Sequence, residues 1–164
     1  MLKERLKVPY VEQNNENSCG PAALEMVFKF YGININQNDI FEQYKKPNPD
    51  LKDNYYITTD DLVNFAKNNG FNESFWKKTD LTEKEINNLI NGFIEKRIPI
   101  IACQQFTKEI PSGHFRVVTG IFKNKIYFHD PYDGPRKNWT MNKFIDYWMP
   151  SGKTVTGGVY IIIK

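Results

Sequence analysis

The chain has 164 residues, of which 40% are hydrophobic, 15% aromatic and 25% charged. These values are typical of a soluble globular protein, and a chain of this length is expected to form one domain, residues 1–164. The formal net charge of +3 comes from scattered Lys and Arg, which argues against a nucleic-acid partner or an anionic membrane surface. No apolar run reaches the roughly 18 residues of a membrane-spanning helix, so no membrane segment is expected.

The start of the chain, MLKERLKVPY, lacks the apolar core of a secretory signal. The protein is therefore expected in the cytoplasm as the sequence stands, or outside the cell if a signal preceded it. Its two cysteines, Cys19 and Cys103, are too few for a disulfide framework, and the absence of a CxxC pair argues against structural zinc. No cofactor is expected.

The first strong pattern predicts a buried helix. An extended lead-in over 7–11 and an Asn-rich loop that runs to Ser18 precede a helical pattern that continues to Tyr31, and Gly32 ends it. The helix is apolar nearly all the way round. Glu25 and Lys29, four residues apart, form its only charged strip, so one edge is expected to face water.

Three further helices follow in the first half of the chain. The pattern predicts a short helix over 36–45, an irregular stretch over 47–54, and a helix that Thr58 or Thr59 caps and Gly70 ends. A strand is predicted over 71–76, before a helix that begins with a Thr82–Glu85 capping box. The predicted buried faces are Leu62, Val63, Phe65 and Ala66 in the one helix and Ile86, Leu89, Ile90, Phe93 and Ile94 in the other.

The second half of the chain predicts strands. The segments 98–106, 114–122 and 125–130 are rich in β-branched and aromatic residues, and Lys123-Asn124 predicts a hairpin turn between the last two. A Pro/Gly loop over 130–138 and a last strand over 155–163 complete the pattern. Between them, Thr140 is expected to cap a short helix that carries Phe144, Tyr147 and Trp148. Helices followed by antiparallel strands indicate the α+β class.

Cys19 stands at the start of the first helix, in the segment NSCGPAALEM. Unpaired N–H groups and the helix dipole favour a thiolate there, so the pKa of this thiol should be low. Gly20 leaves room for an incoming carbonyl, and Pro21 suits an early helical position. The alternative is that Cys19 is a small buried apolar residue beside two helix-start residues.

His114 is the best candidate for a base that activates Cys19. It begins an apolar strand, so its ring can project from the end of the sheet. The hairpin brings the start of this strand near the end of the next one, so Asp130 should lie close enough to orient His114. The alternatives are a solvated histidine and a turn at Asp130-Pro131.

Cys103 and His129 are interpreted as structural residues. Cys103 lies in the apolar run IPIIAC, and His129 alternates with Tyr127 on one strand face. His129 cannot easily pair with Asp130, because successive strand residues point to opposite faces. The spacing of the cysteines and histidines offers no ligand pairs, so a zinc site is not expected.

Taken together, these residues form an ordered set along the chain. The set is Gln13, Cys19-Gly20-Pro21-Ala22, Gly113-His114, Asp130-Pro131 with Gly134, and finally Phe144 and Trp148. It resembles the C39-like branch of the papain-like cysteine peptidases over nearly the whole chain. The resemblance implies a papain-like fold in which a helical half that carries the nucleophile packs on an antiparallel sheet.

The resemblance also implies roles for four residues. Cys19 would be the nucleophile, His114 the general base and acid, Asp130 the orienting carboxylate, and Gln13 an oxyanion-hole donor together with the Cys19 backbone N–H. From the sequence alone, Gln13 is one polar loop residue among asparagines. The expected activity is hydrolysis of peptide or amide bonds in a peptide or protein substrate, through a covalent thioester.

Other functions stay open at this point. The same residues could pass the acyl group to an amine, or the fold could serve as a non-catalytic peptide-binding module. An interaction protein with Trp139, Tyr147 and Trp148 on a contact surface is a further alternative, although helical spacing favours core packing.

The chain also departs from one branch of this family. Bacteriocin-processing members usually have an acidic residue where this chain has Ser18, and they are fused to transporter segments, whereas this chain ends at Lys164. A stand-alone hydrolase is therefore expected rather than a peptidase for double-glycine leaders. The sequence does not predict the oligomeric state.

Overall fold

The computed structural model describes residues 5–164. Residues 1–4 lie outside the described residues. They begin the segment MLKERLKVPY, for which no secretory signal is expected. The helices are α1 (Cys19–Phe30), α2 (Gln37–Tyr44), α3 (Thr59–Asn68), α4 (Glu83–Glu95) and α5 (Met141–Trp148). The strands are β1 (Lys46–Pro47), β2 (Tyr55–Tyr56), β3 (Phe75–Lys78), β4 (Ile100–Gln105), β5 (Gly113–Phe122), β6 (Lys125–Asp130), β7 (Gly134–Thr140) and β8 (Val159–Ile162).

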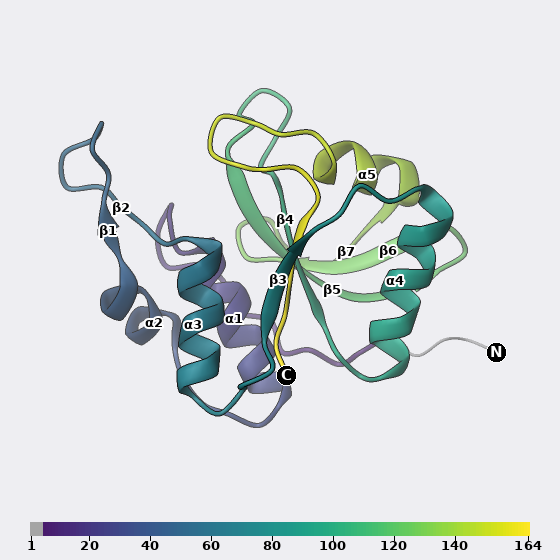
Figure 1. The fold of residues 1–164 in the computed structure, drawn as a ribbon, viewed down its shortest axis with the longest axis horizontal. Coiled ribbons are helices and arrows are strands. Elements are labelled where there is room, and N and C mark those ends of the chain that lie inside the picture. The colour runs from purple at the N-terminus through teal and green to yellow at the C-terminus, as the bar shows by residue number, and fades with distance from the viewer. Residues whose placement is uncertain (1–4) are drawn as a thin grey trace.

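A six-stranded antiparallel sheet in the order β3-β8-β4-β5-β6-β7 forms the centre of the fold. Helix α1 packs on one face of the sheet with α2 and α3 beside it, while α4 and α5 pack on the other face (Figure 1). The predicted α+β class is therefore confirmed. Among the described residues, no helix has both the length and the apolar character to cross a bilayer.

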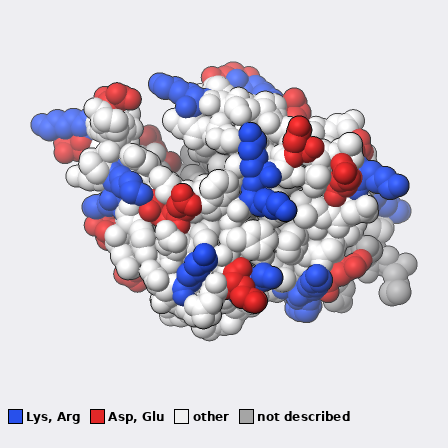
Figure 2. Space-filling view, in the orientation of Figure 1, with Lys and Arg blue, Asp and Glu red and all other residues white. Residues whose placement is uncertain are grey.

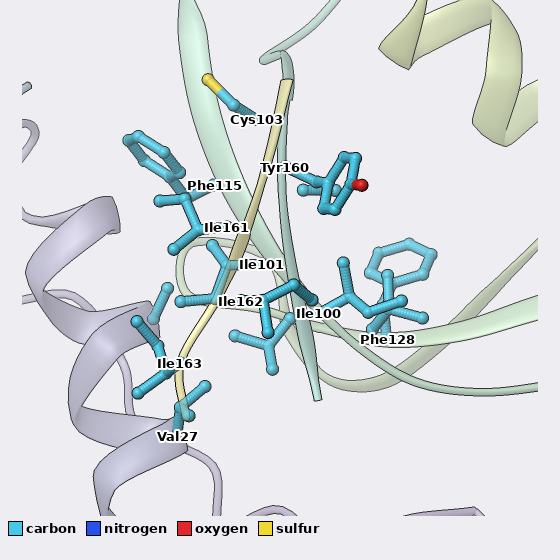
Figure 3. Close-up of a cluster of buried hydrophobic side chains, with 14 of the residues drawn as sticks. Val27, Ile100, Ile101, Cys103, Phe115, Phe128, Tyr160, Ile161, Ile162 and Ile163 are labelled. Carbon is cyan, nitrogen blue, oxygen red and sulfur yellow. The ribbon is translucent and has the colours of Figure 1, made fainter. Parts of the chain in front are cut away.

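The core lies on both faces of the central strands. Every residue of β4 and of β8 is buried, so neither strand shows the alternation of a half-exposed strand. Figure 3 shows Phe115 and Ile161 on the side of α1, and Tyr160 and Phe128 on the opposite side. Burial on both faces explains why this part of the sequence consists of nearly continuous apolar runs.

The helix starts confirm the cap predictions. Thr58 and Thr82 each accept a hydrogen bond from the backbone N–H three residues on, and Asp61 and Glu85 complete the two capping boxes. Thr140 caps α5 in the same way, through the N–H of Lys143. These contacts are local, which is why the sequence shows them.

The hairpin between β5 and β6 is also confirmed. Lys123 and Asn124 both have positive φ, at 46° and 60°, as the tight turn between twisted strands requires. The register then pairs Val117 with His129, and a bulge at Thr119 adds one residue to β5. This register fixes which residues of the two strands lie opposite each other.

The loop predicted over 130–138 is wrong for most of its length, because β7 begins at Gly134 and pairs with β6. β7 is an edge strand whose side chains are mostly exposed, so no apolar alternation marks it in the sequence. Pro135 is tolerated at a sheet edge, where its missing N–H breaks no ladder.

Three other segments differ from their predicted bounds. The stretch 47–54 is enclosed by the short antiparallel pair β1 and β2. The strand predicted over 71–76 begins only at Phe75, because a turn from Phe71 to Ser74 precedes it. The last strand is shorter than 155–163, since β8 covers only the residues that pair with β3 and β4.

The prediction that Glu25 faces water at one edge of α1 is wrong. It forms the expected ion pair with Lys29, Nζ to Oε1 at 3.0 Å, but its side chain is buried. Its Oε2 accepts from the backbone N–H of Gln37 at 2.8 Å, at the first residue of α2. A carboxylate at this helix end satisfies an N–H group that the helix leaves unpaired.

Candidate active site

Cys19 is the first residue of α1, and its thiol is buried at the point where the helix meets β5. Burial tends to raise the pKa of this thiol. The hydrogen bond and charge of His114, together with the backbone N–H groups of Phe115 and Gly20, outweigh burial and hold the pKa below its ordinary value. Pro21 lies in the first helical turn, where its missing N–H costs no helix bond.

His114 lies between Cys19 and Asp130. Its Nε2 donates to Asp130 Oδ1 at 2.7 Å, and both side chains are buried. Because Nε2 carries this bond, Nδ1 is left for the thiol. Burial tends to lower the pKa of His114, but the hydrogen bonds with Asp130 and Cys19 and their charges raise it above its ordinary value.

Asp130 is held from several directions. Besides His114, its Oδ1 accepts from the N–H groups of Tyr132 at 2.9 Å and Asp133 at 3.1 Å, while Oδ2 accepts from Arg116 Nε at 2.8 Å. Burial would raise the pKa of this carboxyl. The His114 hydrogen bond, the charges of His114 and Arg116 and the Tyr132 N–H hold it far below its usual range.

Arg116 is a residue of this site that the sequence reasoning missed. It is two residues after His114 on β5, so both side chains lie on the same strand face. The signal was a single charged residue in the apolar segment HFRVVTGIF. A lone charge in such a run indicates a buried partner, and here the partner is Asp130.

Gln13 lies in the loop before α1. Its backbone N–H donates to Pro131 O at 2.9 Å, which ties the loop to the residue after Asp130. Its side-chain Nε2 donates to Asn15 O at 2.8 Å, while Oε1 is buried and has no hydrogen-bond partner among the described residues. The structure thus brings the Gln13 backbone next to the Asp130 segment, but the side-chain amide N–H is engaged within its own loop.

Gln37 fixes this loop from outside. Its side chain donates to Glu12 O at 2.7 Å and accepts from the Asn14 N–H at 2.8 Å, so it holds the backbone on both sides of Gln13. Gln37 is buried and is itself held through the Glu25 carboxylate. The buried charge of α1 therefore fixes the Gln13 loop by way of α2.

Gly20 differs from its predicted use. A Cβ built on it would lie 2.9 Å from Leu62 Cδ1 and 3.2 Å from the Phe115 ring. The space expected for an incoming carbonyl is thus occupied by two core side chains. A glycine is needed here so that α1 can approach α3 and β5 closely.

Cys103 and His129 have the surroundings of structural residues. Both ring nitrogens of His129 bond backbone groups, Nε2 to Val8 O at 2.8 Å and Nδ1 from the Arg136 N–H at 3.0 Å. Burial, and to a lesser degree the charge of Cys19, raises the pKa of Cys103 to about 12. Within residues 5–164, no group of three or more His, Cys, Asp and Glu side chains is placed to hold a metal ion.

Aromatic rings border His114. The Phe106 ring lies 4.9 Å from the imidazole, and Tyr132 meets Phe106 edge-on at 5.0 Å. Tyr132 is exposed, whereas Trp148 is fully buried, which confirms the core role expected for Trp148. In the view of Figure 2, Lys and Arg are interspersed with Asp and Glu.

Comparisons with known proteins agree with this architecture. The model of the Peptidase_C39 like family matches residues 5–156. The peptidase domain of Streptococcus ComA, a bifunctional ABC transporter of a quorum-sensing pathway, is 26% identical, with a TM-score of 0.68 over 93% of this chain and 96% of that one. No curated protein matches the sequence.

Two further solved structures share the fold at lower identity. A protein described as a C39-like peptidase from Bacillus anthracis is 16% identical, with a TM-score of 0.69 over 98% of both chains. A double glycine motif protease from an AMS/PCAT transporter, solved in complex with the leader peptide, is 18% identical, with a TM-score of 0.66 over 100% of this chain and 97% of that one. The predicted papain-like α+β fold is thereby confirmed.

Proposed function

This chain belongs to the C39-like peptidase family, and on that premise we propose that it is a thiol-dependent hydrolase of peptide or amide bonds. The observation that carries the proposal is the buried contact of 2.7 Å between His114 Nε2 and Asp130 Oδ1, with the Cys19 thiol on the other side of the same imidazole. An inert thiol needs neither an oriented imidazole nor a lowered pKa, so this arrangement favours catalysis over a peptide-binding module.

The reaction would proceed in two halves. His114 Nδ1 takes the Cys19 proton, and the thiolate adds to the amide carbonyl carbon. The oxyanion that forms is stabilised by the Cys19 backbone N–H and the Gln13 side-chain amide, once this amide turns from Asn15 toward the site. The C–N bond then breaks, the leaving amine takes the proton from His114, and the acyl group remains on sulfur as a thioester.

Water completes the second half. His114 takes a proton from the water, whose oxygen adds to the thioester carbonyl, and the C–S bond breaks to give a carboxylic acid and free Cys19. Throughout, Asp130 holds the imidazole in the tautomer that has its proton on Nε2. An amine in place of water would give acyl transfer by the same steps, and product analysis with added amines separates the two outcomes.

A peptide is the substrate class that the comparisons support best. One protein of the same fold was solved in complex with a leader peptide, and the 26% identical ComA domain is described as a peptidase. The exposed Tyr132 and the partly exposed Phe106 beside His114 offer an apolar surface for a substrate side chain. That the natural substrate is not a double-glycine leader stays a prediction, which rests on Ser18.

The test is an activity-based cysteine probe followed by a peptide-library screen. The wild type should be labelled at Cys19 and should cleave a subset of peptides, whereas Cys19→Ala should do neither. Cys103→Ala is the matched control and should keep both activities. Turnover by folded Cys19→Ala, or a wild-type Cys19 that the probe ignores, would contradict the proposal.

A further inference from the structure

We infer that Arg116 is a positioning residue of the proposed site, whose permanent positive charge keeps Asp130 ionised and fixed against His114. The inference rests on the proposed function, since it assigns a task within the same reaction. Within residues 5–164, Arg116 makes no hydrogen bond to Cys19, and its contact with the site is made through Asp130.

All three guanidinium nitrogens of Arg116 donate hydrogen bonds, which hold the group in one orientation. Nε donates to Asp130 Oδ2 at 2.8 Å, and one terminal nitrogen donates to Gln104 Oε1 at 3.3 Å and Gln105 O at 3.1 Å. The other terminal nitrogen donates to Phe106 O at 2.9 Å. Because a planar guanidinium presents its donors at fixed angles, these contacts also fix the direction of Nε toward the carboxylate.

The register of the sheet explains why this pair forms. Val117 lies opposite His129, so the next residues along the antiparallel strands, Arg116 and Asp130, face each other. Gln104 lies opposite His114 on β4, and its amide donates to Phe144 O of α5 at 3.1 Å. Three strands and one helix therefore converge on the guanidinium.

The burial of Arg116 argues that the charge has a use beyond packing. Its side chain is only 3% exposed and lies 4.8 Å from the centre of the Trp139 ring. A buried ion pair is often no more stabilising than apolar side chains of the same volume. Stability alone would therefore be served as well by a third valine in the run that continues with Val117 and Val118.

The proposed reaction cycle gives the buried charge of Arg116 a function. His114 loses its positive charge each time it gives a proton to a leaving group. Without Arg116, the buried Asp130 would then have only a neutral ring and two backbone N–H groups as partners. Burial then favours the protonated carboxyl, which no longer accepts from Nε2 of the ring. The charge of Arg116 does not change in the cycle, so it holds Asp130 as a carboxylate at every step.

Other charged and titratable groups surround this pair, and none of them replaces its charge. Cys19 on α1, Cys103 on β4 and Tyr147 on α5 carry no positive charge. The hydroxyl of Tyr10 donates to Asp130 O, a backbone atom, at 3.1 Å, and the Asp133 carboxylate pairs with Lys137 at 3.4 Å. The ammonium groups of Lys108 and Lys143 lie 4.8 Å and 5.9 Å from the centre of the Tyr147 ring. Both lysines are exposed to solvent, so neither replaces the buried charge.

The test follows the rate of Cys19 alkylation by iodoacetamide as a function of pH, which needs no known substrate. Removal of a buried positive charge raises the pKa of the thiol and of Asp130 alike. The midpoint of the acid limb should therefore move to higher pH by roughly one unit in Arg116→Gln and Arg116→Met. Arg116→Lys keeps the charge and should keep the wild-type midpoint. Its alkylation rate should be lower, because a single ammonium group cannot make all the hydrogen bonds of the guanidinium.

The outcomes separate this inference from the proposed function. If wild-type Cys19 reacts no faster than it does in His114→Ala, the proposed function fails. If the wild type behaves as expected but folded Arg116→Gln keeps its midpoint, only the role of Arg116 is overturned. If neither Arg116→Gln nor Arg116→Met folds, Arg116→Lys provides the test. A midpoint that moves by roughly one pH unit in this variant would show that the positive charge is not what matters.

Discussion

Arg116 and Asp130 form an ion pair in which both side chains are 3% exposed and Nε lies 2.8 Å from Oδ2. The carboxylate that accepts from His114 on one oxygen is therefore held by the Arg116 guanidinium on the other. Since the contacts of Asp130 lie within the fold, changes at this residue should affect stability as well as chemistry.

Asp130→Asn should lower the free energy of unfolding at pH 7 by about 3–5 kcal/mol, because it leaves Arg116 buried without its counter-charge. The pKa of Asp130 in the folded state is below that of the unfolded chain. Its stabilising contribution is therefore present above the unfolded value of about 4 and is lost as the pH falls toward the folded value. Urea denaturation from pH 7 downward should show the wild-type and Asp130→Asn curves converging below about pH 4.

The control for this experiment is Asp133→Asn. The Asp133 side chain is 69% exposed and pairs only with Lys137 in the described part of the chain. The substitution should change stability by less than about 1 kcal/mol at any pH. A constant gap between wild type and Asp130→Asn down to low pH would contradict the assignment of the lowered pKa.

The two cysteines should differ in reactivity although both are buried. Burial raises the pKa of Cys103 to about 12, whereas His114 and backbone N–H groups hold that of Cys19 below its ordinary value. At about pH 6, iodoacetamide should label Cys19 of the folded protein and leave Cys103 unmodified, because only a thiolate reacts at an appreciable rate. Mass spectrometry of the digested protein locates the label, and unfolding in urea should make the two sites equivalent.

Gln13→Ala should lower kcat by about 100- to 1000-fold if its amide turns into the oxyanion site during the reaction. The side chain is half-buried and has its amide N–H bonded within its own loop, so the fold should persist. The neighbouring Asn14→Ala removes only an exposed contact with Asn38 and should change kcat by less than about threefold. Equal activities of the two variants would remove Gln13 from the mechanism.

Gly20→Ala should destabilise the protein by about 1–3 kcal/mol, because the new methyl group meets Leu62 and the Phe115 ring in a filled core. Gly92→Ala is the matched control, since Gly92 lies within α4 and nothing approaches its added Cβ within 4 Å. There the same change should stabilise the protein by about 0.5–1 kcal/mol through helix propensity. Thermal unfolding compares the two, and a combined loss in Gly20→Ala/Leu62→Ala that is smaller than the sum of the two single losses would locate the overlap.

The local features of this protein could be predicted from its sequence. Thr58, Thr82 and Thr140 mark helix starts through contacts made within one turn of chain, and Lys123-Asn124 sets the hairpin that brings His114 to Asp130. The ordered set of Cys19, His114 and Asp130 with their flanking residues indicated the family, and the family model that matches residues 5–156 confirms it. The one-domain interpretation of residues 1–164 stays a prediction.

Other features were decided only by tertiary structure. β7 has no apolar alternation because it is an edge strand, and Gly20 is required by side chains of α3 and β5 that no local pattern reveals. The charge of Arg116 is stable inside the sheet because Asp130 reaches it from the next strand and three oxygens of residues 104–106 accept its other hydrogen bonds. A buried charge depends on what lies opposite it, and that is fixed by the packing of segments distant in sequence.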